Sequence, residues 1–294
     1  MADTTGEADL RKEYVDGAIK AIALMEYKLK TLCTIDSSNA WTETYYRETN
    51  SELEGGESAT ADTNVKGIPR LAPFPYGEVS WTKVQALNEK YGMEGMISYE
   101  DAMLNNIPMI QRTLLRIGRA VAYSVDSEIA ASMLSDANNT FAITGGSEWD
   151  SDTVANRDPV FDILNGIQYL RADNINALNG SGYLVLNGTD YTNILRNSKV
   201  INNPSFKTAD VVSNGVVGSI CGLKIMVTQA LEATTPDVAY IVVAKEAMTW
   251  KEATPLTVVQ VEDPGIKTTI RAFELGQCQV TSPNAICKIT NTRK

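Results

Sequence analysis

The sequence predicts an α+β protein whose central feature is one long helix. Three observations lead to this prediction: an apolar stripe of helical period, a polar arm before it, and short apolar strands after it. Large apolar side chains recur every three or four residues from Tyr99 to Leu134, which places them on one face of a helix. This helix would be about 54 Å long, whereas a globule of this chain length is only about 50 Å across. We therefore expect a flat or elongated subunit.

The first element is expected to be an amphipathic helix over residues 7–32. Its acidic residues come early and Lys28 and Lys30 come late, an order that the helix dipole favours. Its apolar positions share one face; they are Leu10, Tyr14, Ala18, Ile22, Met25 and Leu29. The polar residues 36–39 then end the helix.

The segment 40–95 predicts a projecting β-arm. Strands are expected over 41–49 and 78–90, and the tip between them is rich in Glu, Gly, Ser and Thr and contains three prolines. Such a tip is too polar to form a core of its own. Loops of this length are uncommon in compact domains unless they are functional. The alternative interpretation is a disordered surface loop.

The long helix is expected to begin with Ser98 as its N-cap and Asp101 three positions later, a pattern similar to a capping box. Pro108 lies inside the helical pattern. Because proline interrupts the backbone hydrogen bonds of a helix, a kink or break is expected near Asn105 and Asn106.

A basic stripe lies on the polar face of the long helix. Arg112, Arg116 and Arg119 follow one another at helical spacing, and adjacent like charges repel. The β-arm offers acidic partners: Glu48, Glu52, Glu54, Glu57 and Asp62. We therefore predict that the arm of one subunit lies near the arginine stripe of a neighbour. The alternative is an ordinary solvated face.

After the long helix the pattern is mixed α and β. Asp158 and Pro159 are typical of an N-cap followed by the first helical residue, and a helix is expected through Leu170. The remaining expected elements are a buried strand over 183–186, a short helix over 189–197, a glycine-punctuated β pair over 211–227, and strands over 239–244, 256–261, 270–275, 278–280 and 286–289.

Composition excludes several function classes. The net charge of -10 argues against a general nucleic-acid binder, because phosphate contacts need clustered Lys and Arg. The chain has no histidine, which removes Ser-His-Asp and Cys-His catalysis and histidine-based metal sites. The cysteines lack CxxC spacing and are expected to be buried free thiols; they are Cys33, Cys221, Cys278 and Cys287. No apolar run is long enough for a membrane span, and no secretory signal is recognised.

The remaining candidates for chemistry are weak. Ser80 and Lys83 match an SxxK pattern, but they lie in a segment that alternates like a strand, and no companion motif follows. Glu148, Asp150 and Asp152, with Ser151 between the last two, offer hard oxygen ligands for calcium or magnesium, yet a solvated loop explains the same residues. We predict no catalytic, cofactor-binding or metal-binding residue, which favours a structural or binding protein.

The order of the elements resembles the major capsid proteins of tailed bacteriophages and archaeal tailed viruses, which share the Hong Kong 97 phage-type fold. Residues 182–187, GYLVLN, look like the strand of that family that ends in Asn before a helix. Residues 218–227, GSICGLKIMV, look like its glycine-bounded hairpin, and the closing strands after Gly276 are also similar. The resemblance covers nearly the whole chain.

The resemblance implies a division of the chain. Residues 1–40 would be an N-terminal arm and 41–97 an extended β-loop. Residues 98–150 and 250–294 would form the peripheral domain with its spine helix, and 151–249 the axial domain. Some relatives join subunits through a Lys–Asn isopeptide bond; no crosslinking lysine is predicted here. A scaffold, where one is used, is expected to be a separate protein or to have been removed already from this numbering.

The resemblance also implies a function. It is that of a major capsid protein, which assembles in the host cytoplasm into hexamers and pentamers and forms an icosahedral shell around double-stranded DNA. The implied partners are other copies of the chain, a portal, scaffolding or cement proteins, and packaged DNA in weak non-specific contact, with no membrane and no cofactor. One alternative is an encapsulin-type nanocompartment shell enclosing enzyme cargo. Another is an enzyme that uses Ser80 and Lys83.

Overall fold

The computed structural model describes residues 12–48, 70–71, 81–104, 107–197, 200, 218–234 and 237–294. The helices are α1 (Lys12–Glu26), α2 (Tyr99–Met103), α3 (Ile107–Asp136), α4 (Pro159–Ala172), α5 (Gly188–Arg196) and α8 (Ala230–Thr234), with short 3₁₀ turns η2 (Leu29–Leu32), η4 (Val154–Asn156) and η5 (Pro283–Ala285). The strands are β1 (Thr34–Ser37), β2 (Thr42–Glu48), β3 (Trp81–Leu87), β4 (Glu89–Ser98), β5 (Asn139–Ala142), β6 (Gly182–Leu186), β7 (Ser219–Ile220), β8 (Leu223–Val227), β9 (Val238–Val243), β10 (Met248–Asp263), β11 (Lys267–Val280) and β12 (Ile286–Thr290).

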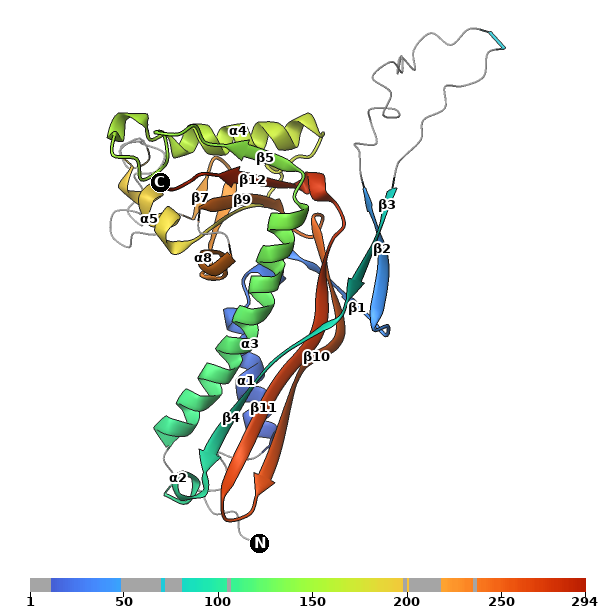
Figure 1. Ribbon diagram of the computed structural model, residues 1–294, viewed down its shortest axis with the longest axis vertical. Helices are drawn as coiled ribbons and strands as arrows, with labels where there is room; N and C mark the ends of the chain where they lie inside the picture. Colours follow the sequence, from blue (N-terminus) through green and yellow to red (C-terminus); the bar gives the residue numbers. More distant parts are fainter. Residues whose placement is uncertain are drawn as a thin grey trace.

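One half of the molecule is an elongated sheet covered by helices. The described strands form a four-stranded sheet in the order β1-β10-β11-β4, in which β10 and β11 are long antiparallel neighbours. The helix α3 packs against β4 and β11, and α1 packs against both α3 and β10. Figure 1 shows these elements running together along the longest axis of the molecule. The expectation of an elongated subunit is therefore confirmed.

The other half is a six-stranded sheet in the order β5-β12-β9-β6-β8-β7. The helix α4 packs on β5 and β12, while α8 lies beside α3 (Figure 1). The central strand β9 is buried along its whole length, which explains its uninterrupted apolar sequence. Trp149 and Tyr240 are fully buried in this core.

The apolar stripe forms a helix, but two helices replace the single long one. Ser98 caps α2: its hydroxyl accepts a hydrogen bond from the backbone N–H of Asp101 at 3.1 Å. This helix ends at Met103 and α3 begins at Ile107, so the interruption predicted from Pro108 is confirmed. The stripe is buried from Ile110 through Met133. Met103 does not join it, because its side chain is 73% exposed on α2.

The first helix is shorter than expected and buries a different face. It ends at Glu26 and a 3₁₀ turn follows. Val15, Ile19 and Ala23, at i, i+4 and i+8, are fully buried, whereas Ala18 and Ile22 from the predicted face are only half-buried. Leu10 lies outside the described residues, as do the side chains of Tyr14 and Met25.

The arm contains the two predicted strands, but a third strand follows them. The strands β2 and β3 pair antiparallel with each other, while the segment expected as a single strand over 78–90 turns at Asn88 into β4. β4 pairs with β11 in the four-stranded sheet. Gly92 and Gly95 weaken its strand signal; an added Cβ would lie 2.9 Å from Phe273 and 2.7 Å from Ile117, respectively. Close packing therefore requires glycine at these two positions, and the same glycines make β4 difficult to recognise as a strand from the sequence.

The last strands are longer than the sequence indicates. The predicted strands over 270–275 and 278–280 are one strand, β11, and Gly276 does not interrupt it. A Cβ on Gly276 would lie 2.6 Å from the carbonyl oxygen of Lys251 and 2.8 Å from the Trp250 ring. The glycine therefore makes room for a buried tryptophan and does not form a turn.

The helix predicted to begin at Asp158 is confirmed as α4. The Asp158 carboxylate accepts a hydrogen bond from the Phe161 N–H at 3.2 Å.

Substitution of Gly276 tests this close packing. Gly276→Ala should lower the free energy of unfolding by about 1–3 kcal/mol, because the new methyl group has no space. Gly17→Ala is the matched control, since Gly17 is exposed on α1 with nothing within 4 Å of an added Cβ. It should raise stability by up to about 1 kcal/mol. Urea denaturation of the two variants checks both signs, and a stabilising Gly276→Ala would contradict the packing.

Candidate assembly surfaces

The β2–β3 hairpin is attached to the rest of the subunit by polar contacts. Arg47 of β2 forms an ion pair with Asp136 at the end of α3, at 2.6 Å. Glu43 accepts a hydrogen bond from the side-chain amide of Gln279 on β11 at 3.3 Å. Below them, the Asn88 amide donates to the carbonyl oxygen of Ala40 at 2.6 Å. Figure 1 shows the hairpin standing beside the body.

The free face of the hairpin carries large apolar side chains. Side chains alternate between the two faces of a strand, and the outward-facing set includes Tyr46, Trp81 and Leu87, which are 59%, 50% and 48% exposed. Trp41, just before β2, is 65% exposed. Tyr46 and Trp81 line a shallow open hollow between them. A two-stranded hairpin with such a face is marginal alone and favours a covering partner.

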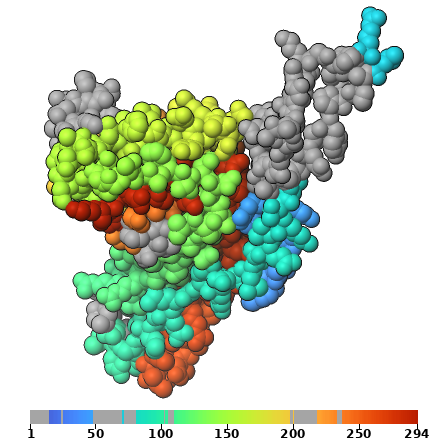
Figure 2. Space-filling view, turned by 45° about the horizontal axis from the view of Figure 1, so that its top comes forward, coloured from blue at the N-terminus to red at the C-terminus, as the bar shows by residue number. Residues whose placement is uncertain are grey.

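A second uncovered apolar area lies at the end of the molecule distant from the six-stranded sheet. There α2 and the turn between β10 and β11 lie together; Figure 2 shows this turn in orange. Several apolar side chains of these segments and of the adjoining strand β4 are exposed; those at or above 60% are Met96, Met103, Leu104 and Ile266. Contiguous exposed apolar side chains are typical of interaction sites rather than of free surface.

The arginine stripe on α3 is exposed, as expected for a basic face. Arg119 pairs at 2.8 Å with Glu26 of α1, so one of the three arginines already has a partner in its own chain. Arg112 and Arg116 make no ion pair with another described residue. Of the predicted acidic partners, Glu48 ends β2 opposite Trp81. The other four lie outside the described residues; they are Glu52, Glu54, Glu57 and Asp62.

A buried ion cluster, which the sequence did not predict, fixes the N-terminal segment. Glu274 of β11 is fully buried and accepts hydrogen bonds from the Tyr27 hydroxyl at 2.6 Å and the Trp250 indole N–H at 3.0 Å. The Lys30 ammonium pairs with Glu274 and, at 3.0 Å, with Glu252. Burial and the neighbouring Glu274 carboxylate raise the pKa of Tyr27 well above its usual range. The phenol therefore remains a hydrogen-bond donor at neutral pH.

Lys30 was expected in the last turn of the first helix, but α1 ends at Glu26 and Lys30 lies in the 3₁₀ turn that follows. Only 8% of the residue is exposed, because the helix ends before it and the chain turns into the sheet. Asp126 of α3 fixes the same turn, accepting hydrogen bonds from the backbone N–H groups of Lys28 at 2.8 Å and Lys30 at 3.1 Å. Burial raises the pKa of Asp126, and these N–H groups oppose the shift.

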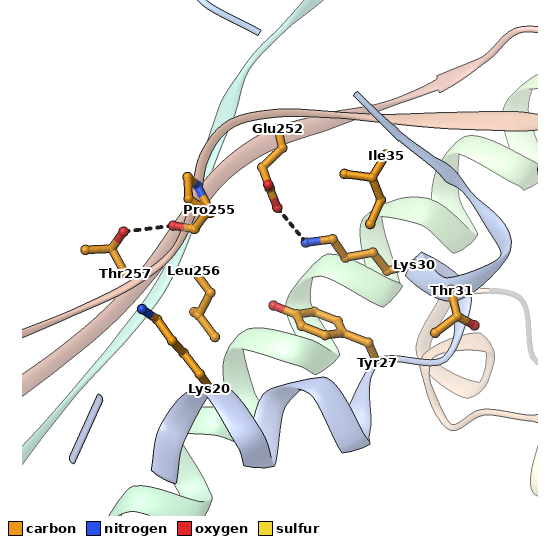
Figure 3. A pocket seen from close by; sticks show the side chains of 9 residues that line it. All are labelled: Lys20, Tyr27, Lys30, Thr31, Ile35, Glu252, Pro255, Leu256 and Thr257. Atoms are coloured by element: carbon orange, nitrogen blue, oxygen red, sulfur yellow. Dashed lines mark hydrogen bonds and ion pairs between the residues drawn. The ribbon is translucent and has the colours of Figure 1, made fainter. Parts of the chain in front are cut away.

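A groove opens beside this cluster, between α1 and the irregular middle of β10. Its volume is about 380 Å³. Figure 3 shows Leu256 and Pro255 on one side, the Tyr27 ring on the other, and the Lys30–Glu252 pair at one end. The register of β10 against β11 shifts between Glu252 and Thr257, and a strand bends locally at such a bulge. The groove therefore lies beside the irregular part of β10.

The residues considered for chemistry are not gathered into a site. Lys83 is exposed in a strand, and Ser80 lies outside the described residues. Asp152 pairs with Lys294 at 2.7 Å and Asp150 accepts the Lys294 backbone N–H at 3.0 Å. In the part of the chain that is described, no group of three or more acidic or cysteine side chains could hold a metal ion. No described helix is long and apolar enough to cross a membrane.

The cysteines are free, as predicted. Cys33, Cys278 and Cys287 are buried, and Cys221 is half-buried. Burial raises the pKa of the Cys287 thiol to about 12, which keeps it protonated. Such thiols serve packing rather than redox chemistry.

Comparison with known proteins was made by sequence family and by structure. A family model described as phage capsid protein matches residues 83–289. This match spans more than half of the chain and includes α3 and the strands from β4 to β11. Comparison with curated proteins finds no match.

Several solved structures share the fold. The capsid of cyanophage P-SCSP1u gives a TM-score of 0.67 at 13% identity, covering 90% of this chain and 88% of that one. A virus-like particle from Pyrococcus furiosus gives 0.62 at 12% identity, covering 94% and 98%. The structure of Mycobacterium phage Che8 gives 0.61 at 16% identity, covering 91% and 92%. These likenesses confirm the predicted α+β fold of the Hong Kong 97 phage type.

The Lys30–Glu274 pair should be the strongest single anchor of the N-terminal segment. Glu274→Gln leaves a buried ammonium with one of its two carboxylates, and should lower the free energy of unfolding by about 3–5 kcal/mol. The matched control is Arg119→Gln, which breaks a pair whose side chains are 57% and 37% exposed. It should cost less than about 1 kcal/mol.

Chemical denaturation measures both losses. In a double-mutant cycle, Lys30→Met with Glu274→Gln should lose clearly less than the sum of the single losses, because neither charge then stays buried alone. Equal losses for Glu274→Gln and Arg119→Gln would refute the assigned role.

Proposed function

Because the chain belongs to the phage capsid protein family, and is thus a shell protein of the virion, we propose that its subunits assemble into hexamers and pentamers that close an icosahedral shell around double-stranded DNA. The mechanism is association rather than turnover of a substrate. The assembly would take place in the host cytoplasm.

The observation that carries this proposal is exposed apolar surface at two separate places on the subunit. The aromatic face of the β2–β3 hairpin and the area around α2 lie far apart on one elongated molecule (Figure 1). A single dimer contact would cover one of these areas and leave the other in water. Two separate surfaces are both covered when each subunit meets several neighbours, and such contacts strengthen one another.

The charged surfaces supplement this apolar association. We propose that the arm residues 48–62, which carry five acids and no lysine or arginine, lie against Arg112 and Arg116 of a neighbouring subunit. Arg119 contributes to the same stripe while it holds Glu26 of its own chain. Ion pairs of this kind set the register of neighbours more than the strength of their association.

Other partners follow from the same proposal. A portal, and scaffolding or cement proteins, would bind the shell as separate chains. Contact with packaged DNA would be weak and independent of sequence, because the net charge of the subunit is -10 and few cations are available for phosphates.

A second candidate function is an encapsulin-type nanocompartment that encloses enzyme cargo. The likeness to a virus-like particle from Pyrococcus furiosus, which is covered over 98% of its chain, favours it. The contents of purified particles separate the two functions. Electron microscopy with nuclease-protected nucleic acid supports the virion, whereas co-purifying enzyme without nucleic acid supports the compartment. A protein that remains monomeric at high concentration would contradict both.

Removal of one exposed aromatic side chain tests the apolar contact. Trp81→Ser should raise the concentration needed for assembly at least tenfold, because aromatic anchors at interfaces contribute about 2 kcal/mol or more. Gln85→Ser is the matched control. Gln85 is exposed on the same face of β3 as Trp81 and Lys83, but its side chain is polar. Light scattering against protein concentration measures assembly. Unchanged assembly by Trp81→Ser would exclude the hairpin face as a contact.

Charge reversal tests the arginine stripe. Replacement of Arg112, Arg116 and Arg119 by Glu should prevent assembly at physiological salt, because like charges then face each other across the contact. Replacement of Glu52, Glu54 and Glu57 by Lys in the same chain should restore it. Sedimentation of the two variants measures particle formation. Normal assembly by the arginine variant would show that the stripe is a solvated face.

A further inference from the structure

The segment 291–294, which follows β12, is held by acidic side chains from three separate parts of the subunit. Arg293 makes two hydrogen bonds with Glu232 of α8, at 3.2 and 3.1 Å. Lys294 pairs with Asp152 of the loop before α4 at 2.7 Å. Asp190 of α5 lies beneath the segment. No part of the capsid function proposed above requires this arrangement.

Asp190 is the buried member of this group. Its side chain is fully buried, and one carboxylate oxygen accepts a hydrogen bond from the Thr292 hydroxyl at 3.0 Å. The other oxygen is 3.5 Å from Nε of Arg293, which is too long for a good hydrogen bond. Both of these atoms lack another hydrogen-bond partner among the described residues. The pair is therefore an ion contact that only partly compensates the burial of the carboxylate.

Several charges act on this carboxylate. Burial raises the pKa of Asp190 to about 6; the Thr292 hydroxyl and Arg293 oppose the rise, while Glu232 and Asp150 add to it. The segment itself supplies much of the cover, because Thr292 is fully buried. Its backbone N–H donates to the Asp237 carbonyl at 3.0 Å, and its carbonyl accepts from the Trp149 N–H at 2.9 Å. Detachment of the segment would expose Asp190 to water and return its pKa toward the ordinary value of 3.8.

We propose that segment 291–294 is a proton-controlled clasp, which holds α5, α8 and the loop before α4 together more tightly when Asp190 is neutral than when it is ionised. The sign follows from linkage. The docked state binds the Asp190 proton more tightly than the detached state, so docking gains free energy as the pH falls through 6 toward 4. Docking loses that free energy as the pH rises through 6. Above about pH 7, titration of Asp190 no longer changes the free energy of docking.

Hydrogen exchange of the segment tests the clasp. Peptides containing residues 286–294 are followed by mass spectrometry on the full-length protein between pH 4.5 and 7.5, with exchange corrected for the intrinsic effect of pH. In the wild type, the equilibrium for opening should fall at least tenfold from pH 7.5 to pH 4.5, because one pK unit corresponds to a tenfold change. Asp190→Asn should remove this dependence, since the amide keeps an acceptor for Thr292 and does not titrate.

Two further variants separate the clasp from a general effect of pH. Arg293→Gln removes the cation that lowers the pKa of Asp190, so the midpoint of the dependence should move to higher pH. Asp152→Asn, the control, removes the ion pair of Lys294 and should leave the midpoint unchanged. A wild type without the tenfold change, or with the same profile as Asp190→Asn, overturns the proposal. An unchanged midpoint in Arg293→Gln would also overturn the proposal. This second result decides the question even if the Asp190→Asn variant does not fold.

Discussion

The helix α3 belongs to two hydrophobic cores at once, and this sharing determines the shape of the subunit. Its first half, from Ile110 to Val121, packs into the core beneath the four-stranded sheet. Its second half, from Ala122 to Met133, packs into the larger core that includes the six-stranded sheet. Each fully buried aliphatic side chain contributes about 1.5–3 kcal/mol. Neither core can therefore lose the helix, and the two sheets are held along one rigid rod rather than folded against each other.

The polar anchors lie where the two cores meet, and this position explains their burial. Asp126 of α3 and Glu274 of β11 both hold the turn after α1, which leads the chain from the helix into β1. Such buried charges contribute little net stability, but they penalise any arrangement that leaves one of them unpaired. An apolar turn at this point could slide along α3. The ion cluster with Lys30 allows only the register in which every charge has its partner.

The sequence predicts the fold best where a single period governs many residues. The stripe from Ile110 to Met133 is correct because helical burial repeats without exception there. Prediction fails where a residue serves a neighbour that is distant in sequence. Gly276 resembles a turn residue, yet it is small to admit the Trp250 ring of β10. Gly92 is small because the backbone and Cβ of Phe273 on β11 lie against it. Lys30 resembles a solvated charge, and only the fold brings Glu274 to it. The arginine stripe was predictable as an exposed face, whereas the pairing of Arg119 with Glu26 was not.

The buried charges of this capsid subunit have partners within the chain, whereas its exposed apolar side chains do not. This difference explains how the subunit can fold before it assembles. The buried charges find partners within the chain, so the isolated subunit carries no large electrostatic penalty at Lys30 or Glu274. What remains exposed is apolar, at the hairpin and around α2, and an exposed apolar side chain costs far less than an unpaired buried charge. The ion pair between Arg47 of the hairpin and Asp136, which is partly exposed to water, fits the same division. It holds the hairpin out from the body through contacts that water can replace, so the hairpin can adjust to a neighbour without disturbing either core.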